Sequence, residues 1–138
     1  MGLWRFLDYL ADDQVPRNLI QHWYGQQAVE VQAEFDATVA TLGATENWKK
    51  AKAFKPLTRE HRGLGEIRFT VRTGRGRKET KRRFRPVGMW REDAREFIFL
   101  IGCEKLPRGV LIPADAFELA LRHKAKLERG EGDICEHY

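Results

Sequence analysis

The chain has 138 residues, of which 42% are hydrophobic, 11% aromatic and 33% charged, and its formal net charge is +5. This length suits one domain with a single core, and the aromatic content argues against a disordered chain. No apolar run approaches the ~20 residues of a membrane span, and the first residues lack the pattern of a secretion signal, so we expect a cytoplasmic protein.

The positive charge is concentrated in the middle third of the chain. Residues 1–47 carry a net charge of −5, residues 48–91 carry +13, and residues 92–138 carry −3. Clustered Lys and Arg release counterions when they bind phosphates, so this segregation favours a polyanionic partner such as nucleic acid. A solvated charged face and an acidic protein partner are the alternatives.

The N-terminal part predicts a strand followed by helices. Residues 3–10 are apolar and aromatic enough for a first strand. Apolar residues then recur at helical spacing over 16–42, where Gly25 can divide the stretch in two and Gly43 is placed to end it. Residues 45–54 predict a further short helix.

The middle of the chain predicts three strands. Residues 63–72 alternate polar and apolar side chains, residues 81–90 alternate less regularly, and residues 95–106 contain an almost continuous apolar run. The connections, 73–80 and 91–95, are short enough for hairpins. The three strands are therefore expected to form an antiparallel meander.

A last helix is expected to start near Pro113 and to end at Gly130, and the tail "EGDICEHY" reads as irregular. The predicted fold class is α+β: an N-terminal strand and helices, a three-stranded antiparallel meander and a C-terminal helix. We expect residues 1–138 to form one domain. The cysteines Cys103 and Cys135 do not suggest a disulfide framework.

The run "GRGRKETKRRFRP", from Gly74 to Pro86, is the most basic part of the chain. Its position between two predicted strands makes it a basic hairpin rather than a loose tail. Its side chains and one neighbour are the predicted RNA-binding residues. They are Arg72, Arg75, Arg77, Lys78, Lys81, Arg82 and Arg83.

No metal-ligand, phosphate-loop or nucleophile motif is present in the sequence. A sheet face with Arg68, Arg83 or Arg85, and Lys105 suits a different chemistry, the cleavage of RNA without a metal cofactor. The 2′-hydroxyl then attacks the adjacent phosphate, and fixed guanidinium groups stabilise the added negative charge of the transition state. Arg85 precedes Pro86, so an exposed position at a sheet edge is an equal alternative for it.

The reaction also needs a general base and a general acid. The titratable candidates are His61, His123, His137, Glu136 and Tyr138. His123 is flanked by basic residues in the last helix, and its expected place is the helix surface. The last two residues of the chain are expected to be unordered by default.

The order of four motifs resembles that of toxins of the RelE/ParE superfamily, in particular the phage-derived, Gp49-like, HigB-type branch. The motifs are "GLGEIRF", "RFRPVGMW", "FIFLIGCEK" and the helix "PADAFELALRHKAKLERG", and the resemblance covers about residues 55–130. It implies a compact α+β fold with a twisted antiparallel sheet. It also implies a type II toxin that cleaves mRNA on the ribosome without a cofactor and is inhibited by a small antitoxin, here expected to be of the helix-turn-helix type.

The resemblance assigns roles to individual residues. Arg68, Arg85 and Lys105 match the basic positions of the three strands. The ending "EHY" is similar to that of some HigB-like toxins, although in a different order, which makes His137 and Tyr138 candidates for proton transfer.

Two departures from the family pattern are clear. A helix tyrosine of certain RelE-like members falls near Phe117, which has no hydroxyl group, and the loop "RTGRGRKETK" is longer and more basic than a tight hairpin needs. This loop can hold ribosomal RNA, or an acidic antitoxin segment can cover it. The alternatives to the ribonuclease are a ParE-like inhibitor of DNA gyrase and a non-toxic nucleic-acid-binding protein on the same fold.

Overall fold

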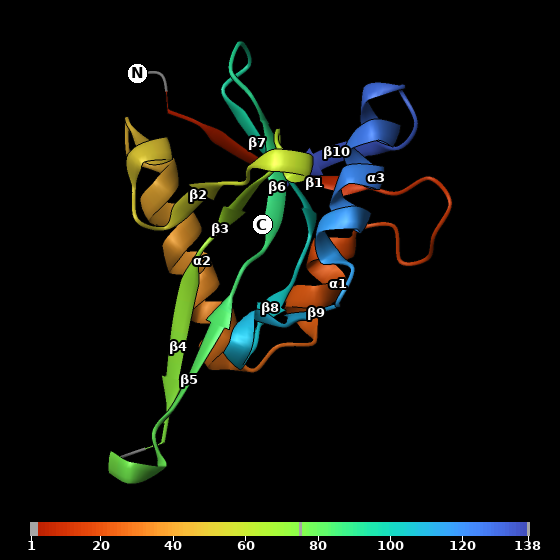
Figure 1. Ribbon diagram of the computed structural model, residues 1–138. Coiled ribbons are helices and arrows are strands. Elements are labelled where there is room, and N and C mark those ends of the chain that lie inside the picture. Colours follow the sequence, from red (N-terminus) through yellow and green to blue (C-terminus); the bar gives the residue numbers. More distant parts are fainter. Residues whose placement is uncertain (1–2, 75, 138) are drawn as a thin grey trace.

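The computed structural model describes residues 3–74 and 76–137, and within them the fold is α+β with three α-helices and two sheets (Figure 1). In the same residues, no helix has the length and apolar character needed to cross a membrane. The helices are α1 (Leu19–Gly25), α2 (Val29–Gly43) and α3 (Ala116–Glu128).

The first sheet has six strands and is mixed, because β1 runs parallel to β7 and the other pairs are antiparallel. The second sheet has four antiparallel strands. In spatial order the first sheet is β10 (Asp133–Glu136), β1 (Arg5–Leu10), β7 (Glu96–Ile101), β6 (Val87–Arg91), β3 (Gly65–Ile67) and β2 (Phe54–Pro56). The second is β4 (Phe69–Thr73), β5 (Thr80–Phe84), β8 (Glu104–Lys105) and β9 (Leu111–Ile112).

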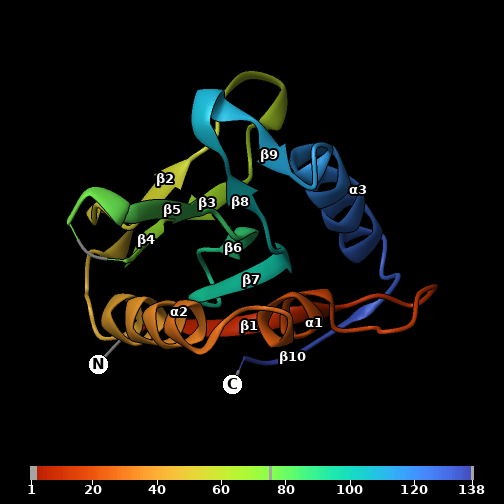
Figure 2. The same cartoon turned by 90° about the horizontal axis from the view of Figure 1, so that it is seen from below.

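Helices cover both faces of the first sheet: α1 and α2 lie on one side and α3 on the other (Figure 2). Side chains therefore point alternately into two apolar clusters. Phe35 of α2 and Phe99 of β7 belong to one cluster, and Ile98 of β7 and Ala120 of α3 belong to the other. This double burial explains why β7 reads as a continuous apolar run.

The expected antiparallel meander is present, but each of its three strands is bent and divided between the two sheets. The first divides into β3 and β4 at Arg68, the second into β5 and β6 at Arg85 and Pro86, and the third into β7 and β8 at Gly102 and Cys103. The expectation of three unbroken strands was therefore wrong. The bends lie side by side, because the Arg85 amide donates to the carbonyl of Cys103 over 2.8 Å and Pro86 accepts from Ile67 over 2.9 Å.

Two of the bends have a clear cause in the sequence. Pro86 has no amide proton to give to a sheet ladder, so the strand is interrupted there. At Gly102, a Cβ atom would lie 2.1 Å from the Trp23 ring, so only glycine lets the strand pass this side chain. As a result the β4–β5 hairpin extends away from the body of the protein (Figure 1).

The N-terminal expectations are largely confirmed. The first strand is β1, and the helical stretch is divided into α1 and α2, with Gly25 at the end of α1. The expected helix over 45–54 was wrong, since it is reduced to one 3₁₀ turn, η1 (Trp48–Lys50). The chain instead enters β2, where Phe54 is buried against Trp48 and pairs with Ile67, so tertiary packing outweighs local helix propensity.

Two expectations about the C-terminal part were wrong. The tail is not irregular, because β10 pairs with β1, from Leu7 opposite Glu136 to Leu10 opposite Asp133. His123 is not on the helix surface: it is 4% exposed and stacks on the ring of Tyr9. This burial lowers the pKa of His123, so the imidazole is neutral near pH 7.

Candidate nucleic-acid interface

The outer face of the second sheet collects positive charge from three strands. Arg83 of β5 lies between Thr70 of β4 and Lys105 of β8, and Arg72 of β4 lies opposite Lys81 of β5. Directly opposed residues on antiparallel strands project to the same side of a sheet. We call Arg72, Lys81, Arg83 and Lys105 the basic sheet face.

Like charges oppose each other twice on this face, at Arg72–Lys81 and at Arg83–Lys105. Such pairs destabilise a sheet unless counter-charges are present. Arg72 has a distant one, Glu79, at 3.9 Å. In the part of the chain that the structure describes, Lys81, Arg83 and Lys105 have no carboxylate partner, so the face can accept phosphates.

The other predicted RNA-binding residues differ in their surroundings. Arg82 points to the opposite face, where its Nε and Nη2 donate to the two carboxylate oxygens of Glu104 at 2.9 and 2.7 Å and its guanidinium lies over the ring of Phe84. Arg77 and Lys78 are exposed in the 3₁₀ turn η3 (Gly76–Lys78) at the hairpin tip. Arg75 lies outside the described residues.

Arg85 is buried at the bend rather than exposed at an edge: the residue is only 8% exposed. Its Nη1 donates to the carbonyls of Phe84 at 2.8 Å and Phe69 at 3.4 Å. Its Nε–H is buried and has no hydrogen-bond partner among the described residues. A buried donor without a hydrogen bond is unfavourable, so this group is suited to bind an anion in addition to the Glu66 carboxylate, which lies 4.0 Å away.

One buried carboxylate holds the two arginines of the bend together. The Oε1 atom of Glu66 accepts from Nε of Arg68 at 3.1 Å and lies 4.0 Å from Nε of Arg85. Glu66 is 6% exposed, whereas the Arg68 side chain is 32% exposed. Because one carboxylate faces two guanidinium groups, the cluster keeps a net positive charge.

Arg68 and Arg85 line the same open pocket, which has a volume of about 450 Å³. Its walls come from the start of β4, from α2 and from the segment before β2. The other lining residues are Glu34, Thr38, Lys52, Ala53, Phe69 and Thr70. We call this the arginine pocket.

Burial lowers the pKa of the Arg85 guanidinium; Glu66 opposes this effect, and Arg68 and Arg83 add to it. An arginine remains protonated even so, because the ordinary pKa of a guanidinium lies far above neutral pH. The three arginines are therefore close enough to repel one another at the bend. A phosphate bound there would relieve this repulsion.

The structure places His137 elsewhere. Its side chain is 4% exposed, its Nδ1 lies 2.7 Å from Oδ1 of the buried Asp8, and its ring packs against Phe35 and Phe99. It lines a pocket of about 240 Å³ with Asp36, Val39 and Ala40 of α2. This pocket shares no residue with the arginine pocket, which α2 borders through Glu34 and Thr38.

The remaining proton-transfer candidates are also dispersed. Tyr138 lies outside the described residues. His61 packs against Phe117 of α3 with the two rings steeply inclined, and Glu136 lies 3.3 Å from Arg5 at the start of β1. Of the expected catalytic set, the structure brings together Arg68 and Arg85, with Lys105 joined to them through Arg83.

Two residues of the site region escaped the sequence interpretation. Glu66 holds the arginines, and its signal was its position two residues before Arg68 on the same face of an alternating strand. Asp8 fixes His137, and also accepts from Asn18 and Gln21 at 3.0 and 3.2 Å. Its signal was a single carboxylate inside the apolar strand "RFLDYL".

The thiol of Cys103 gives a test of the bend, because it donates to the carbonyl of Arg85 over 2.9 Å. Burial raises its pKa to about 12, and burial also raises the pKa of the more exposed Cys135.

At about pH 8, near the ordinary thiol pKa, iodoacetamide is expected to label Cys135 first and Cys103 only after unfolding. Mass spectrometry of the C135S variant checks this: the native protein should take up no label and the denatured protein one. Rapid labelling of native C135S would show that the bend opens readily.

No family model, curated protein or solved structure matches this chain. The resemblance to RelE/ParE toxins therefore remains a prediction from short sequence motifs.

Proposed function

We propose that this protein is the toxin of a type II toxin–antitoxin system, a RelE/ParE-like endoribonuclease that cleaves mRNA on the ribosome without a metal cofactor. The observation that carries the proposal is the buried Arg85, whose Nε–H has no hydrogen-bond partner among the described residues, in a pocket with Arg68 and beside the basic sheet face. The proposed site of phosphate contact is this bend.

The groups divide into two roles in the proposal. The exposed hairpin and the basic sheet face hold the RNA backbone, since their charges are accessible and largely unpaired. Arg85 and Arg68 contact the phosphate that reacts, because fixed donors stabilise the negative charge that develops in the transition state. Glu66 fixes their positions.

The reaction also needs proton-transfer groups at the arginine pocket. Glu34 is the exposed carboxylate that lines the arginine pocket, and it can accept the 2′-hydroxyl proton there. His137 and the arginine pocket lie on different sides of α2. His137 could therefore act on a phosphate in that pocket only if binding of the RNA or the ribosome rearranged the protein.

This separation of His137 from the arginine pocket favours a second candidate, a nucleic-acid-binding protein on the same fold that does not cleave RNA. A ParE-like inhibitor of DNA gyrase is the third. In each case an acidic antitoxin segment is the proposed partner of the basic face, because it would neutralise the opposed like charges.

The test is to express the protein in a bacterium and to map new mRNA 5′ ends by primer extension, with Arg68→Gln alongside. Arg68 is partly exposed, so its loss should spare the fold. We expect cuts within translated frames that are at least about tenfold weaker in the variant. Growth arrest with DNA damage signalling and no cuts would favour gyrase, and no arrest would favour the binding protein.

A further inference from the structure

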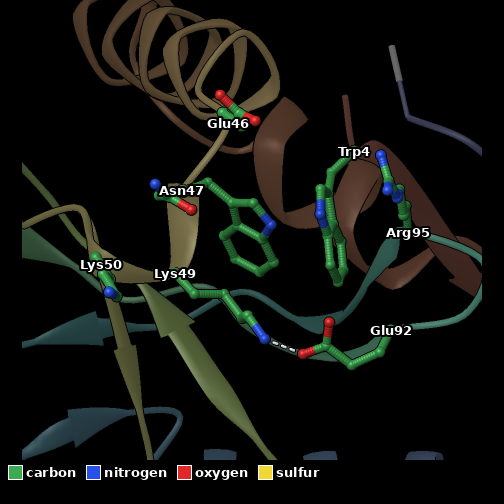
Figure 3. A pocket seen from close by; sticks show the side chains of 8 residues that line it. Trp4, Glu46, Asn47, Lys49, Lys50, Glu92 and Arg95 are labelled. Atoms are coloured by element: carbon green, nitrogen blue, oxygen red, sulfur yellow. Dashed lines mark hydrogen bonds and ion pairs between the residues drawn. The ribbon is translucent and has the colours of Figure 1, made fainter. Parts of the chain in front are cut away.

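A third pocket lies where β1 begins. The start of β1 and the tip of the β4–β5 hairpin are at opposite ends of the protein (Figure 1). The volume of this pocket is about 370 Å³, which falls in the range of about 300–1,000 Å³ that small-molecule sites occupy. Trp4 before β1, residues 46–50 around η1, and Glu92 and Arg95 of the β6–β7 turn line it (Figure 3). It shares no residue with the arginine pocket.

Two tryptophans give this pocket an aromatic wall. Trp48 is 1% exposed and is held edge-on by Phe54 and Phe97, with ring centroids 4.7 and 5.6 Å away. Trp4 is partly exposed, and its ring centroid lies 4.8 Å from that of Trp48. The buried Nε1–H of Trp48 has no acceptor among the residues that the structure describes. The pocket thus offers a rigid aromatic surface and an unused hydrogen-bond donor.

The pocket also contains cations that are free to bind a ligand. Lys49 is engaged, since it forms an ion pair with Glu92 and its Nζ lies 5.9 Å from the centre of the Trp4 ring. Lys50 and Arg95 are exposed and have no carboxylate partner in the described chain. They lie on opposite sides of Trp4 (Figure 3).

We propose that this pocket binds a nucleotide. Its base would stack on Trp4, because aromatic stacking accepts any base and is a common means of holding unpaired nucleotides. Its phosphate would bind Arg95, which lies beside Trp4 (Figure 3), and the Trp48 Nε1–H would donate to an acceptor of the base or ribose. A free nucleotide and an unpaired nucleotide of an RNA strand share this chemistry. The site goes beyond the proposed ribonuclease activity and does not depend on it.

The backbone at Arg95 allows a matched pair of variants. Arg95 has a φ of 55°, in the left-handed region that glycine adopts more readily, and its turn is held by bonds from the Arg95 amide to Glu92 and from the Arg5 amide to Arg95. Arg95→Gly therefore removes the side chain while preserving the turn. Arg108 has a φ of 68° at a distant surface, so Arg108→Gly removes the same charge with the same backbone effect.

The experiment is a calorimetric titration of the full chain with AMP, with adenosine and with a short single-stranded RNA, each in turn. We expect saturable binding of AMP, about tenfold weaker in Trp4→Ala and in Arg95→Gly and unchanged in Arg108→Gly. Adenosine should bind less tightly than AMP, because it lacks the phosphate. If the RNA binds with the same dependence on Trp4 and AMP does not, the ligand is an unpaired nucleotide of a strand.

The proposal is overturned if neither AMP nor RNA saturates, or if Trp4→Ala and Arg95→Gly bind both as the wild type does. Equal binding of adenosine and AMP would overturn the role of Arg95. An Arg68→Gln variant separates this result from the proposed ribonuclease, because it should retain AMP binding whether or not the protein cuts mRNA.

Discussion

Replacing Arg85 with alanine is expected to abolish mRNA cleavage and also to destabilise the fold. The first effect follows from the loss of the buried donor at the proposed phosphate site, which should lower the cleavage rate about a hundredfold or more. The second follows because the carbonyls of Phe69 and Phe84 lose a donor and Glu66 loses one of its two cations. We expect a loss of about 2 kcal/mol in the free energy of unfolding.

Two further variants separate function from folding at this position. Arg85→Lys keeps the charge but lacks the planar fork, so we expect a smaller loss of stability and a loss of cleavage almost as large. Arg122→Ala removes one exposed charge from α3 and should match the wild type in both respects. The measurements are urea unfolding and mRNA cleavage in a ribosome-containing translation reaction. If Arg85→Lys cleaves as fast as Arg122→Ala, the guanidinium at the bend has no special role.

Placing a methyl group at Gly102 is expected to cause the largest loss of stability. The Cβ of Gly102→Ala would lie 2.1, 2.3 and 2.6 Å from three atoms of the Trp23 ring, which packs against Phe35 and Phe84 and cannot easily withdraw. Such overpacking should lower the free energy of unfolding by about 3 kcal/mol.

The control for Gly102→Ala is Gly25→Ala at the end of α1, where an added Cβ meets no atom within 4 Å. This variant should match the wild type or exceed it slightly, because alanine favours helix over glycine. Urea unfolding of the two variants measures the difference. Equal stability would mean that the strand does not need glycine to pass Trp23, and that the bend has another cause.

Sequence periodicity predicted which segments form strands and helices, but not where the strands bend or with which strands they pair. The alternation of polar and apolar residues identified the three strands of the meander, since a strand leaves the same pattern on either side of a bend. The bends themselves depend on Pro86 and on the contact of Gly102 with Trp23, which is a tertiary contact. Local pattern also could not show that Phe54 would pair with Ile67 instead of continuing a helix.

The candidate site was predicted in part for similar reasons. Arg68 and Arg85 occur at corresponding points of neighbouring strands, so the expectation that they lie together was reasonable and the structure places them in one pocket. The burial of Arg85 and the role of Glu66 depend on the bend and so were missed. The position of His137 depends on β10 and on Asp8, which is 129 positions away in the chain.

The pairing of β1 with β7 and β10 has a consequence for how the protein folds during synthesis. β1 leaves the ribosome before the other strands that the structure describes, yet its parallel neighbour begins at Glu96 and its antiparallel neighbour at Asp133. Contacts of such high sequence separation form slowly and late. A nascent chain therefore carries an unprotected edge at β1 until residues 133–136 emerge, and premature termination before Asp133 would leave a product prone to aggregation rather than a partly active one.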